Sequence, residues 1–236
     1  MFQLLCLFLF LYLIIRVINK NLEKQAQLLF NHYFCSENYP SKSNTKLGLV
    51  CECLLGGTPS RTKAEYWNGT ISWINSGEIN NFRITKPSEL ITEIGLSKSA
   101  TKLLPRKTTV IAITGATLGQ VSLLEIDSCA NQSVVGVVPN DKLPYEFIYP
   151  FIKANIQELI SHQTGGAQQH INKQNVESLN IKIPDADLLK DYFTKVSPIY
   201  ELIATNCFEI EHLTILRDSL LPMLMSGEID VANIDL

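Results

Sequence analysis

The sequence lacks the motifs that several classes of enzyme require. It has no Gly-Lys-Ser/Thr phosphate loop, no Asn-Pro-Pro-Tyr motif of the kind used in methyl transfer from S-adenosylmethionine, and no nuclease-like cluster of Asp, Glu and Lys. Its four histidines are scattered, and spacing sets no Ser or Cys beside any of them. We therefore expect no catalytic residues and no cofactor.

Cysteines are few and irregularly spaced. The six of them contain no C-x-x-C pair and no even framework, which argues against a zinc site or a disulfide scaffold. Cys51 and Cys53 have strand spacing, and we interpret them as reduced packing residues. Reduced thiols fit the cytoplasm, where we expect the chain to be found.

Positive charge is in short supply overall, since the formal net charge is -3. This argues mildly against a nucleic-acid partner, because neutralising phosphates requires Lys and Arg. The distribution is uneven, however. Positions 42 to 110 contain ten basic and five acidic residues, whereas positions 187 to 236 contain three basic and nine acidic residues. The middle of the chain is basic and the tail is acidic.

Residues 1–16 form an apolar N-terminal segment of uncertain role. The run ends at Arg16 after about 15 residues, short of the roughly 20 that a spanning helix needs. It lacks the preceding basic segment and the cleavage site of a secretory signal. A buried or partner-facing helix, an atypical start and a membrane segment all remain open, and a membrane is not among the expected partners.

Residues 17–35 are expected to form an N-terminal spacer helix. From Asn19 to Phe34, apolar residues recur every three or four positions between polar ones. The stripe consists of Ile18, Leu22, Ala26, Leu29 and Tyr33. The composition of residues 35–46 indicates a linker.

The middle of the chain, residues 36–185, is expected to form one compact domain with a mixed or antiparallel sheet. Short runs rich in Val, Ile and Thr alternate there with turn residues. The expected strands are 47–55, 70–74, 109–114, 120–125, 133–138 and 179–183. Helices are expected over 88–96 and 144–163.

Residues 186–236 are expected to form a C-terminal spacer helix and tail. Alternating steps of three and four define a heptad seam, with Asn206 as a polar residue that sets the register. The seam consists of Leu189, Tyr192, Val196, Ile199, Ile203, Asn206, Ile210, Leu213, Arg217 and Leu220. Ser197-Pro198 either interrupts this helix or starts a new one. Gly227 is expected to close it.

Several sequence blocks, taken in order, resemble one family. They are Gly56-Gly57-Thr58-Pro59-Ser60, Tyr66-Trp67-Asn68-Gly69, Ile71-Ser72-Trp73, Ile113-Thr114-Gly115-Ala116-Thr117-Leu118-Gly119, Asn131-Gln132, Gly165-Gly166-Ala167-Gln168-Gln169, and Leu216-Arg217-Asp218-Ser219-Leu220-Leu221-Pro222. From about position 17 onward the chain resembles the specificity (S) subunit of type I restriction-modification systems, in a form with one target-recognition domain. It departs from the family pattern in having Ser72 before Trp73 and no basic residue between Gly115 and Lys142.

The resemblance implies an α+β fold, with the target-recognition domain flanked by long helices that form an antiparallel coiled-coil spacer. It implies a non-catalytic subunit that recognises double-stranded DNA and directs methyltransferase and restriction/translocase subunits to the target site. The assembled complex would carry adenine methyltransferase and ATP-dependent endonuclease activity. Because this chain has one recognition domain, we expect two copies to dimerise through residues 17–34 and 187–224; the alternative is that the chain is a fragment of a longer gene. The expected partner and dimer contacts are Leu22, Leu29, Ile199, Ile203, Asn206, Ile210, Leu213 and Leu220.

Two glycine-hinged loops carry the expected DNA contacts. Hydroxyl and cationic groups in the first loop suit phosphate oxygens, and amide side chains in the second suit adenine edges. The candidates are Thr58, Ser60, Arg61, Lys63, Thr114, Gln132, Gln163, Thr164, Gln168, Gln169, His170 and Lys173. Such loops are also often plain turns with solvated polar residues.

Other interpretations remain open at this stage. Trp67 and Trp73 could stack on bases, but their strand spacing favours core anchoring. Asn131 and Gln132 either fix a loop or read a base edge. The whole chain could instead be a membrane-anchored coiled-coil interaction protein, or a recognition domain from a type II-like restriction enzyme.

Overall fold

The structure is a computed structural model that describes residues 2–35, 39–161 and 170–226. The helices are α1 (Phe2–Phe34), α2 (Glu93–Ser97), α3 (Tyr145–Ser161), α4 (Lys173–Glu177) and α5 (Ala186–Met225). The strands are β1 (Ser41–Lys46), β2 (Glu52–Leu55), β3 (Trp67–Ile74), β4 (Glu89–Ile91), β5 (Leu103–Leu104), β6 (Thr109–Ala112), β7 (Val121–Leu123), β8 (Ser128–Ala130), β9 (Val134–Val138) and β10 (Asn180–Pro184). Short 3-10 turns are η1 (Leu47–Leu49), η2 (Ala64–Tyr66), η3 (Ser76–Asn80) and η4 (Gly115–Thr117).

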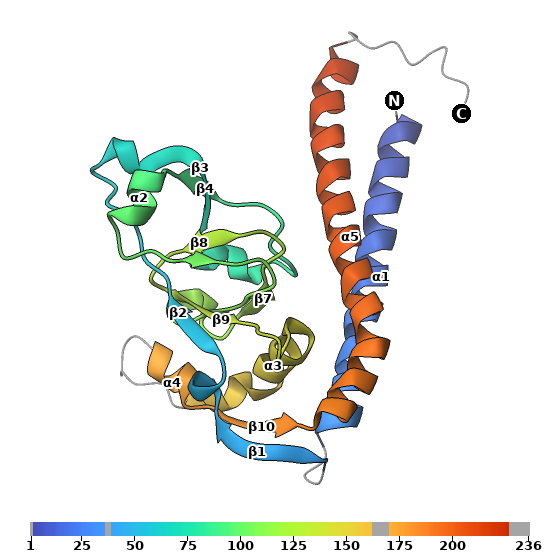
Figure 1. The fold of residues 1–236 in the computed structure, drawn as a ribbon. Coiled ribbons are helices and arrows are strands. Elements are labelled where there is room, and N and C mark those ends of the chain that lie inside the picture. The colour runs from blue at the N-terminus through green and yellow to red at the C-terminus, as the bar shows by residue number, and fades with distance from the viewer. Residues whose placement is uncertain (1, 36–38, 162–169, 227–236) are drawn as a thin grey trace. The chain divides into compact units, whose positions relative to one another are not determined.

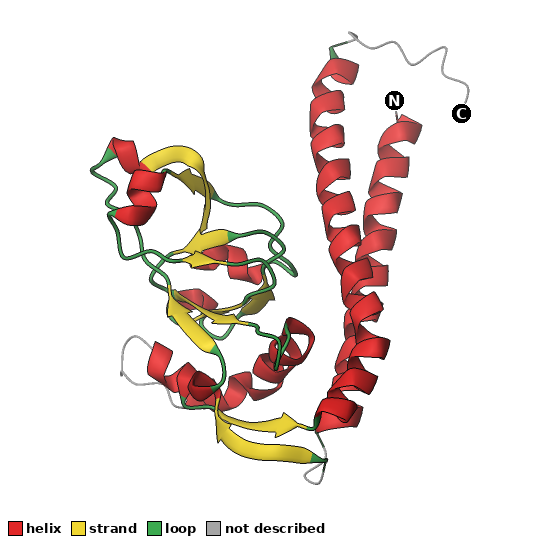
Figure 2. Cartoon of the chain, viewed as in Figure 1, coloured by secondary structure: helices red, strands yellow, loops and turns green. Residues whose placement is uncertain are grey.

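The chain divides into two compact units. Residues 1–29 and 195–236 form one, which we call the hairpin unit, and residues 30–194 form the other, the sheet unit. Helices dominate the first and strands the second (Figure 2). The fold class is α+β, as the sequence predicts.

The sheet unit contains two four-stranded sheets. The first sheet has the order β2-β9-β6-β7 with antiparallel pairings throughout, and the second has the order β4-β3-β8-β5 with β3 and β8 parallel. Both contribute to one apolar core, in which Ile74 of β3, Val110 of β6 and Ala130 of β8 are fully buried. A separate antiparallel ribbon pairs β1 with β10.

Within the sheet unit, an aromatic cluster packs the C-terminal end of α1 and the N-terminal end of α5 against α3. Phe34 of α1 lies edge-on to Phe147 of α3 and to Tyr192 of α5, with ring centroids 5.0 and 4.9 Å apart. The Tyr192 hydroxyl donates to the Glu146 carbonyl over 2.8 Å. Burial raises the pKa of Tyr192, so this hydroxyl stays a donor at neutral pH. The cluster forms only when α1, α3 and α5 each contribute an aromatic ring.

In the hairpin unit α1 and α5 run antiparallel (Figure 1). The Asn206 amide donates to the Asn19 Oδ1 atom over 2.8 Å, so the polar seam residue meets a polar partner on α1. Seam residues of α5 are buried or half-buried, whereas Phe208 and Ile215, which lie off the seam, are exposed. The predicted heptad seam is confirmed. On α1 the predicted stripe is wrong at Ile18, because Asn19 is the buried residue.

Several predicted element boundaries are wrong. The polar segment 35–46, read as a linker, contains β1, which gains its stability from pairing with β10. The helix expected over 88–96 is strand β4 followed by α2, and the Thr92 side chain caps α2 by accepting from the Gly95 amide. The predicted sequence pattern also misses β5 and β8, which are too short to show an alternation.

Both long helices are continuous at positions where the sequence allowed an end or an interruption. α1 begins at Phe2 and includes the apolar segment, rather than starting at Asn19. α5 runs through Pro198 without a break. The buried contacts of Val196, Tyr200 and Ile203 offset the one backbone hydrogen bond that Pro198 cannot donate. Among the described helices, none carries an apolar stretch long enough to cross a bilayer.

Cys51 and Cys53 behave as packing residues. Cys51 and Cys53 are buried free thiols, as the sequence predicts. Burial raises the pKa of Cys51 to about 11 and that of Cys53 to about 12, which keeps both protonated and unreactive at neutral pH.

Candidate functional site

Four of the predicted contact residues come together at one end of the first sheet. Antiparallel pairing places the end of β2, the start of β9 and the end of β6 at the same edge. Thr58, Gln132 and Thr114 follow or precede these strands, and His170 joins them by a bridge to Thr114. We call residues 56–63, 113–119, 131–133 and 170–172 the loop edge.

The first loop lies directly against the backbone of neighbouring segments. The Gly56 amide donates to the Val134 carbonyl, and the Gly57 amide donates to the Ala130 carbonyl. A Cβ on Gly56 would lie 2.1 Å from the Asn131 carbonyl oxygen, and one on Gly57 would lie 2.6 Å from the Ala100 backbone. Glycine is therefore required here for close approach, which fixes where the loop leaves the sheet.

Two tryptophans bind the backbone of the same loop through their indole N–H groups. The Trp73 indole N–H donates to the Gly57 carbonyl and that of Trp67 to the Ser60 carbonyl, each over 3.1 Å. Trp73 is buried, which confirms the core-anchoring interpretation for this residue. Trp67 is only partly buried, and its ring packs edge-on against Trp73. Both side chains thus fix the loop backbone.

Arg61 projects from this anchored loop but is already in contact with other side chains. Its guanidinium lies 3.7 Å from the Trp67 ring centroid and donates to both carboxylate oxygens of Glu89 on β4. The hydrogen bonds from Arg61 lower the pKa of Glu89. The Arg61 side chain is still 53% exposed, so it remains within reach of a ligand.

The neighbouring polar residues of the loop are exposed as well. The Lys63 ammonium donates to the Tyr66 hydroxyl over 2.9 Å, and this contact raises the pKa of Lys63. The Ser60 hydroxyl lies 2.9 Å from that of Thr62. The loop therefore presents three hydroxyl groups and two cationic groups at the surface.

The turn before β9 supports the loop from the side. Thr58 donates its hydroxyl hydrogen to the Gln132 side-chain oxygen, which joins two residues that the sequence predicts separately. The Asn131 side chain accepts from the Ser133 amide, so Asn131 fixes this turn. The Gln132 side chain itself is exposed.

The second predicted loop is seen only at its end. Gln163, Thr164, Gln168 and Gln169 lie outside the described residues. His170 is exposed, and the Ile171 amide donates to the Ile113 carbonyl, which ties this segment to the end of β6. The Lys173 ammonium pairs with Glu177 over 3.2 Å within α4. The structure thus brings His170, but not the glutamines, into view at the loop edge.

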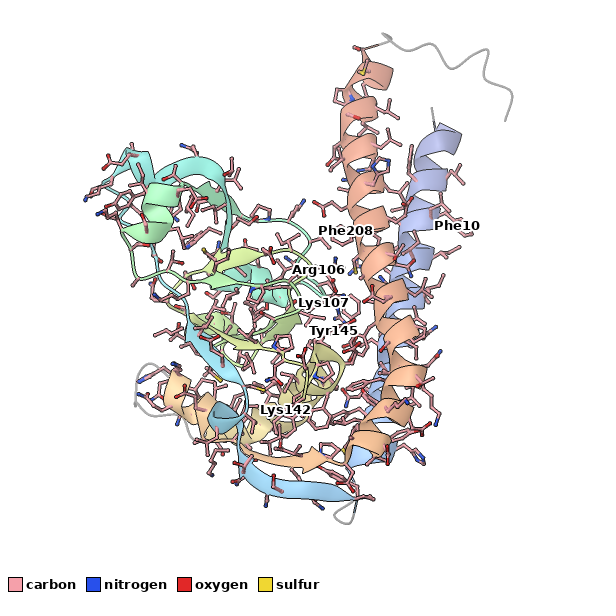
Figure 3. The ribbon with its side chains drawn as sticks, viewed as in Figure 1. Phe10, Arg106, Lys107, Lys142, Tyr145 and Phe208 are labelled. Atoms are coloured by element: carbon pink, nitrogen blue, oxygen red, sulfur yellow. The ribbon has the colours of Figure 1, made fainter. Side chains whose placement is uncertain are left out.

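A second group of cations surrounds the buried Glu125 carboxylate and was not recognised from the sequence. The Glu125 carboxylate lies 2.8 Å from the Lys107 ammonium and within 4 Å of the Arg83 and Arg106 side chains. Figure 3 shows Lys107 beside Tyr145, whose ring centroid is 4.7 Å from the ammonium. Three of the ten basic residues counted between positions 42 and 110 therefore pair with one buried carboxylate.

Pairing across the second sheet explains why sequence reasoning missed Glu89. It stands opposite Trp73 in the β3–β4 pairing, 28 positions after Arg61 in the chain. No periodicity marks such a partner. Within the part of the chain that the structure describes, no three His, Cys, Asp or Glu side chains gather in a way that could hold a metal ion.

Comparisons with known proteins agree on one family. The family profile described as type I restriction modification DNA specificity domain matches residues 41–206. The HindI specificity subunit of Haemophilus influenzae is 28% identical over 194 residues, which cover 80% of this chain and 41% of that protein. The EcoR124I/EcoR124II specificity subunit of Escherichia coli is 28% identical over 59% of this chain and 36% of its own length.

The fold is shared with solved structures. A type I restriction-modification system S subunit from M. genitalium superposes with a TM-score of 0.64 at 14% identity, covering 93% of this chain and 58% of that one. The present chain spans about two-fifths of the length of the curated relatives it matches.

Proposed function

This chain belongs to the family of type I restriction-modification DNA specificity domains, and from this premise we propose that it recognises a double-stranded DNA sequence as a non-catalytic specificity subunit. It would direct methyltransferase and restriction/translocase subunits to that sequence, in the cytoplasm, and the partners would perform the methyl transfer and cleavage. The relatives bear the name of specificity subunits, which supports this assignment.

The loop edge is the observation that carries the proposal. Polar side chains from four distant segments lie at one end of a sheet, and the first of these loops is fixed by two buried glycines and two tryptophans. Phosphate contacts position a protein on DNA, and contacts to base edges supply specificity. We assign phosphate contact to Thr58, Ser60, Arg61 and Lys63. Base or groove contact is assigned to Thr114, Gln132, Gln163, Thr164, Gln168, Gln169, His170 and Lys173.

We further propose that two copies pair through residues 17–34 and 187–224. Within these helices Val17, Leu28 and Ile215 expose 58–60% of their surface. Apolar residues exposed on several sides of a helix are typical of a surface that a partner covers. A pair of chains would present two recognition domains to a split site.

The dimer is tested by sedimentation of the full chain at micromolar concentration, with and without the methyltransferase subunit. The expected mass is that of two copies. Changing Ile215 to Glu should shift the mass towards one copy, whereas the same change at Thr205, an exposed polar position on α5, should not. A single-copy mass for the unaltered chain in both conditions would contradict the dimer.

DNA recognition is tested by selection from a random duplex library in the presence of the methyltransferase subunit. Changing Arg61 and Lys63 to Ala should weaken binding to all duplexes alike and reduce the salt slope by about one to two units. Changing Gln168 and Gln169 to Ala should relax the selected sequence instead. Equal effects of the two double variants would contradict the division between phosphate and base contacts.

A further inference from the structure

The Arg61 guanidinium is held from two directions at the loop edge. The Trp67 ring supports its plane at 3.7 Å, and Trp73 lies 5.2 Å away. Along its edge, the Nη1 and Nη2 atoms each donate to one carboxylate oxygen of Glu89. These contacts fix the position of the guanidinium and also neutralise its charge.

We propose that Glu89 is an internal counter-ion that a DNA phosphate replaces, so that Glu89 limits how tightly the loop binds duplexes of any sequence. This inference rests on the proposed function, because it requires Arg61 to meet a phosphate. Carboxylate and phosphate both present a pair of oxygens to a guanidinium fork. The two anions therefore compete for the same N–H groups.

The exposure of the pair favours exchange. The side chains of Arg61 and Glu89 are 53% and 39% exposed, and an ion pair in this setting is weak in water. A phosphate that replaces the carboxylate releases counter-ions from the duplex, which favours binding at low salt. Trp67 stays in place beneath the guanidinium throughout, because its indole N–H is bonded to the Ser60 carbonyl.

The sign of one substitution separates this role from a simpler one. If a phosphate must displace Glu89 from the Arg61 N–H groups, removing the charge of Glu89 removes the competing anion, so binding should tighten. If Glu89 only positioned Arg61, its removal should loosen binding. Gln preserves the size of the side chain and one acceptor oxygen, which makes E89Q the appropriate variant.

The test measures binding of the full chain to a 30-base-pair duplex of random sequence at several salt concentrations. E89Q should bind about twofold to fivefold more tightly, the range expected for loss of an exposed ion pair, and its salt dependence should be steeper. The matched control is E93Q, which removes an exposed carboxylate from the neighbouring α2. In an R61A background, E89Q should give no gain, because the effect acts through Arg61.

Each other outcome has a distinct meaning. Equal gains in E89Q and E93Q, or a gain that persists in R61A, would overturn the counter-ion role, since net charge alone would then explain the effect. Weaker binding by E89Q would overturn it in favour of positioning. Unchanged binding by R61A alone would show instead that the proposed phosphate contact of the loop is wrong. Thermal melting of each variant confirms that it is folded.

Discussion

The sheet unit contains two groups of ion-paired side chains, one around Glu125 and one around Glu89, and the two groups differ in burial. Around Glu125 the side chains of Arg83 and Glu125 are 0% and 1% exposed. Around Glu89 both partners are open to water. A buried carboxylate cannot be removed without leaving cations in a medium of low dielectric, whereas an exposed one is readily exchanged for water or for another anion. Burial thus decides which charges maintain the fold and which are available to a ligand.

The largest effect is expected from breaking the buried cluster. Changing Glu125 to Gln removes the carboxylate that Arg83 and Lys107 both contact, and should lower the free energy of unfolding by about 3 kcal/mol. Urea unfolding of the full chain measures this loss. The control is Arg106 to Gln, which removes a half-exposed member of the same cluster and should cost less than about 1 kcal/mol. The reverse order of these losses would contradict the comparison.

An intermediate effect is expected from the half-buried polar pair of the hairpin unit. Changing Asn206 to Ala leaves the Oδ1 atom of the buried Asn19 without its donor, which should cost about 1 kcal/mol in urea unfolding. Replacing both residues with Leu should restore this stability, while the fixed register of the helices is lost. If the double variant is less stable than the single one, the polar pair contributes more than register.

The smallest effect is expected from titrating the exposed pair. Because Arg61 lowers the pKa of Glu89, the pair stabilises the fold above the unfolded pKa of glutamate, about 4.3. This contribution is lost as the pH falls through the lower folded pKa. Solvent screening should keep it well below 1 kcal/mol. NMR titration of the Glu89 carboxyl should show the lowered pKa in the unaltered chain and an ordinary value in R61A.

The sequence predicts those parts of the molecule whose signal is local. Ile203 and Asn206 follow the heptad seam of α5, and Val134 to Val138 read directly as a strand that the structure contains. The sequence predicts both Thr58 and Gln132 as polar loop residues, and a hydrogen bond joins them in the structure. Helix and strand periodicity is sufficient for conclusions of this kind.

The remaining features depend on contacts between distant segments. β1 has a polar sequence that resembles a linker, and it forms a strand because it pairs with β10. The paired residues Lys46 and Asn180 are 134 positions apart in the chain. Glu125 pairs with Arg83 across 42 positions, and Glu89 of β4 pairs with Arg61, which lies 28 positions earlier in the loop before β3. Neither pairing leaves a pattern in the sequence, so the charges could be counted but not assigned to structure or binding.

The aromatic cluster of Phe34, Phe147 and Tyr192 has a consequence for the dynamics of the helices. Amide hydrogens near Phe34 and Tyr192 should exchange with solvent as slowly as those of the central strands, because all of them open only when this packing is lost. Protection should then decline along α1 towards Phe2 and along α5 towards Met225. The backbone hydrogen bonds near Phe2 and Met225 would therefore open many times for each opening of those beside the aromatic cluster.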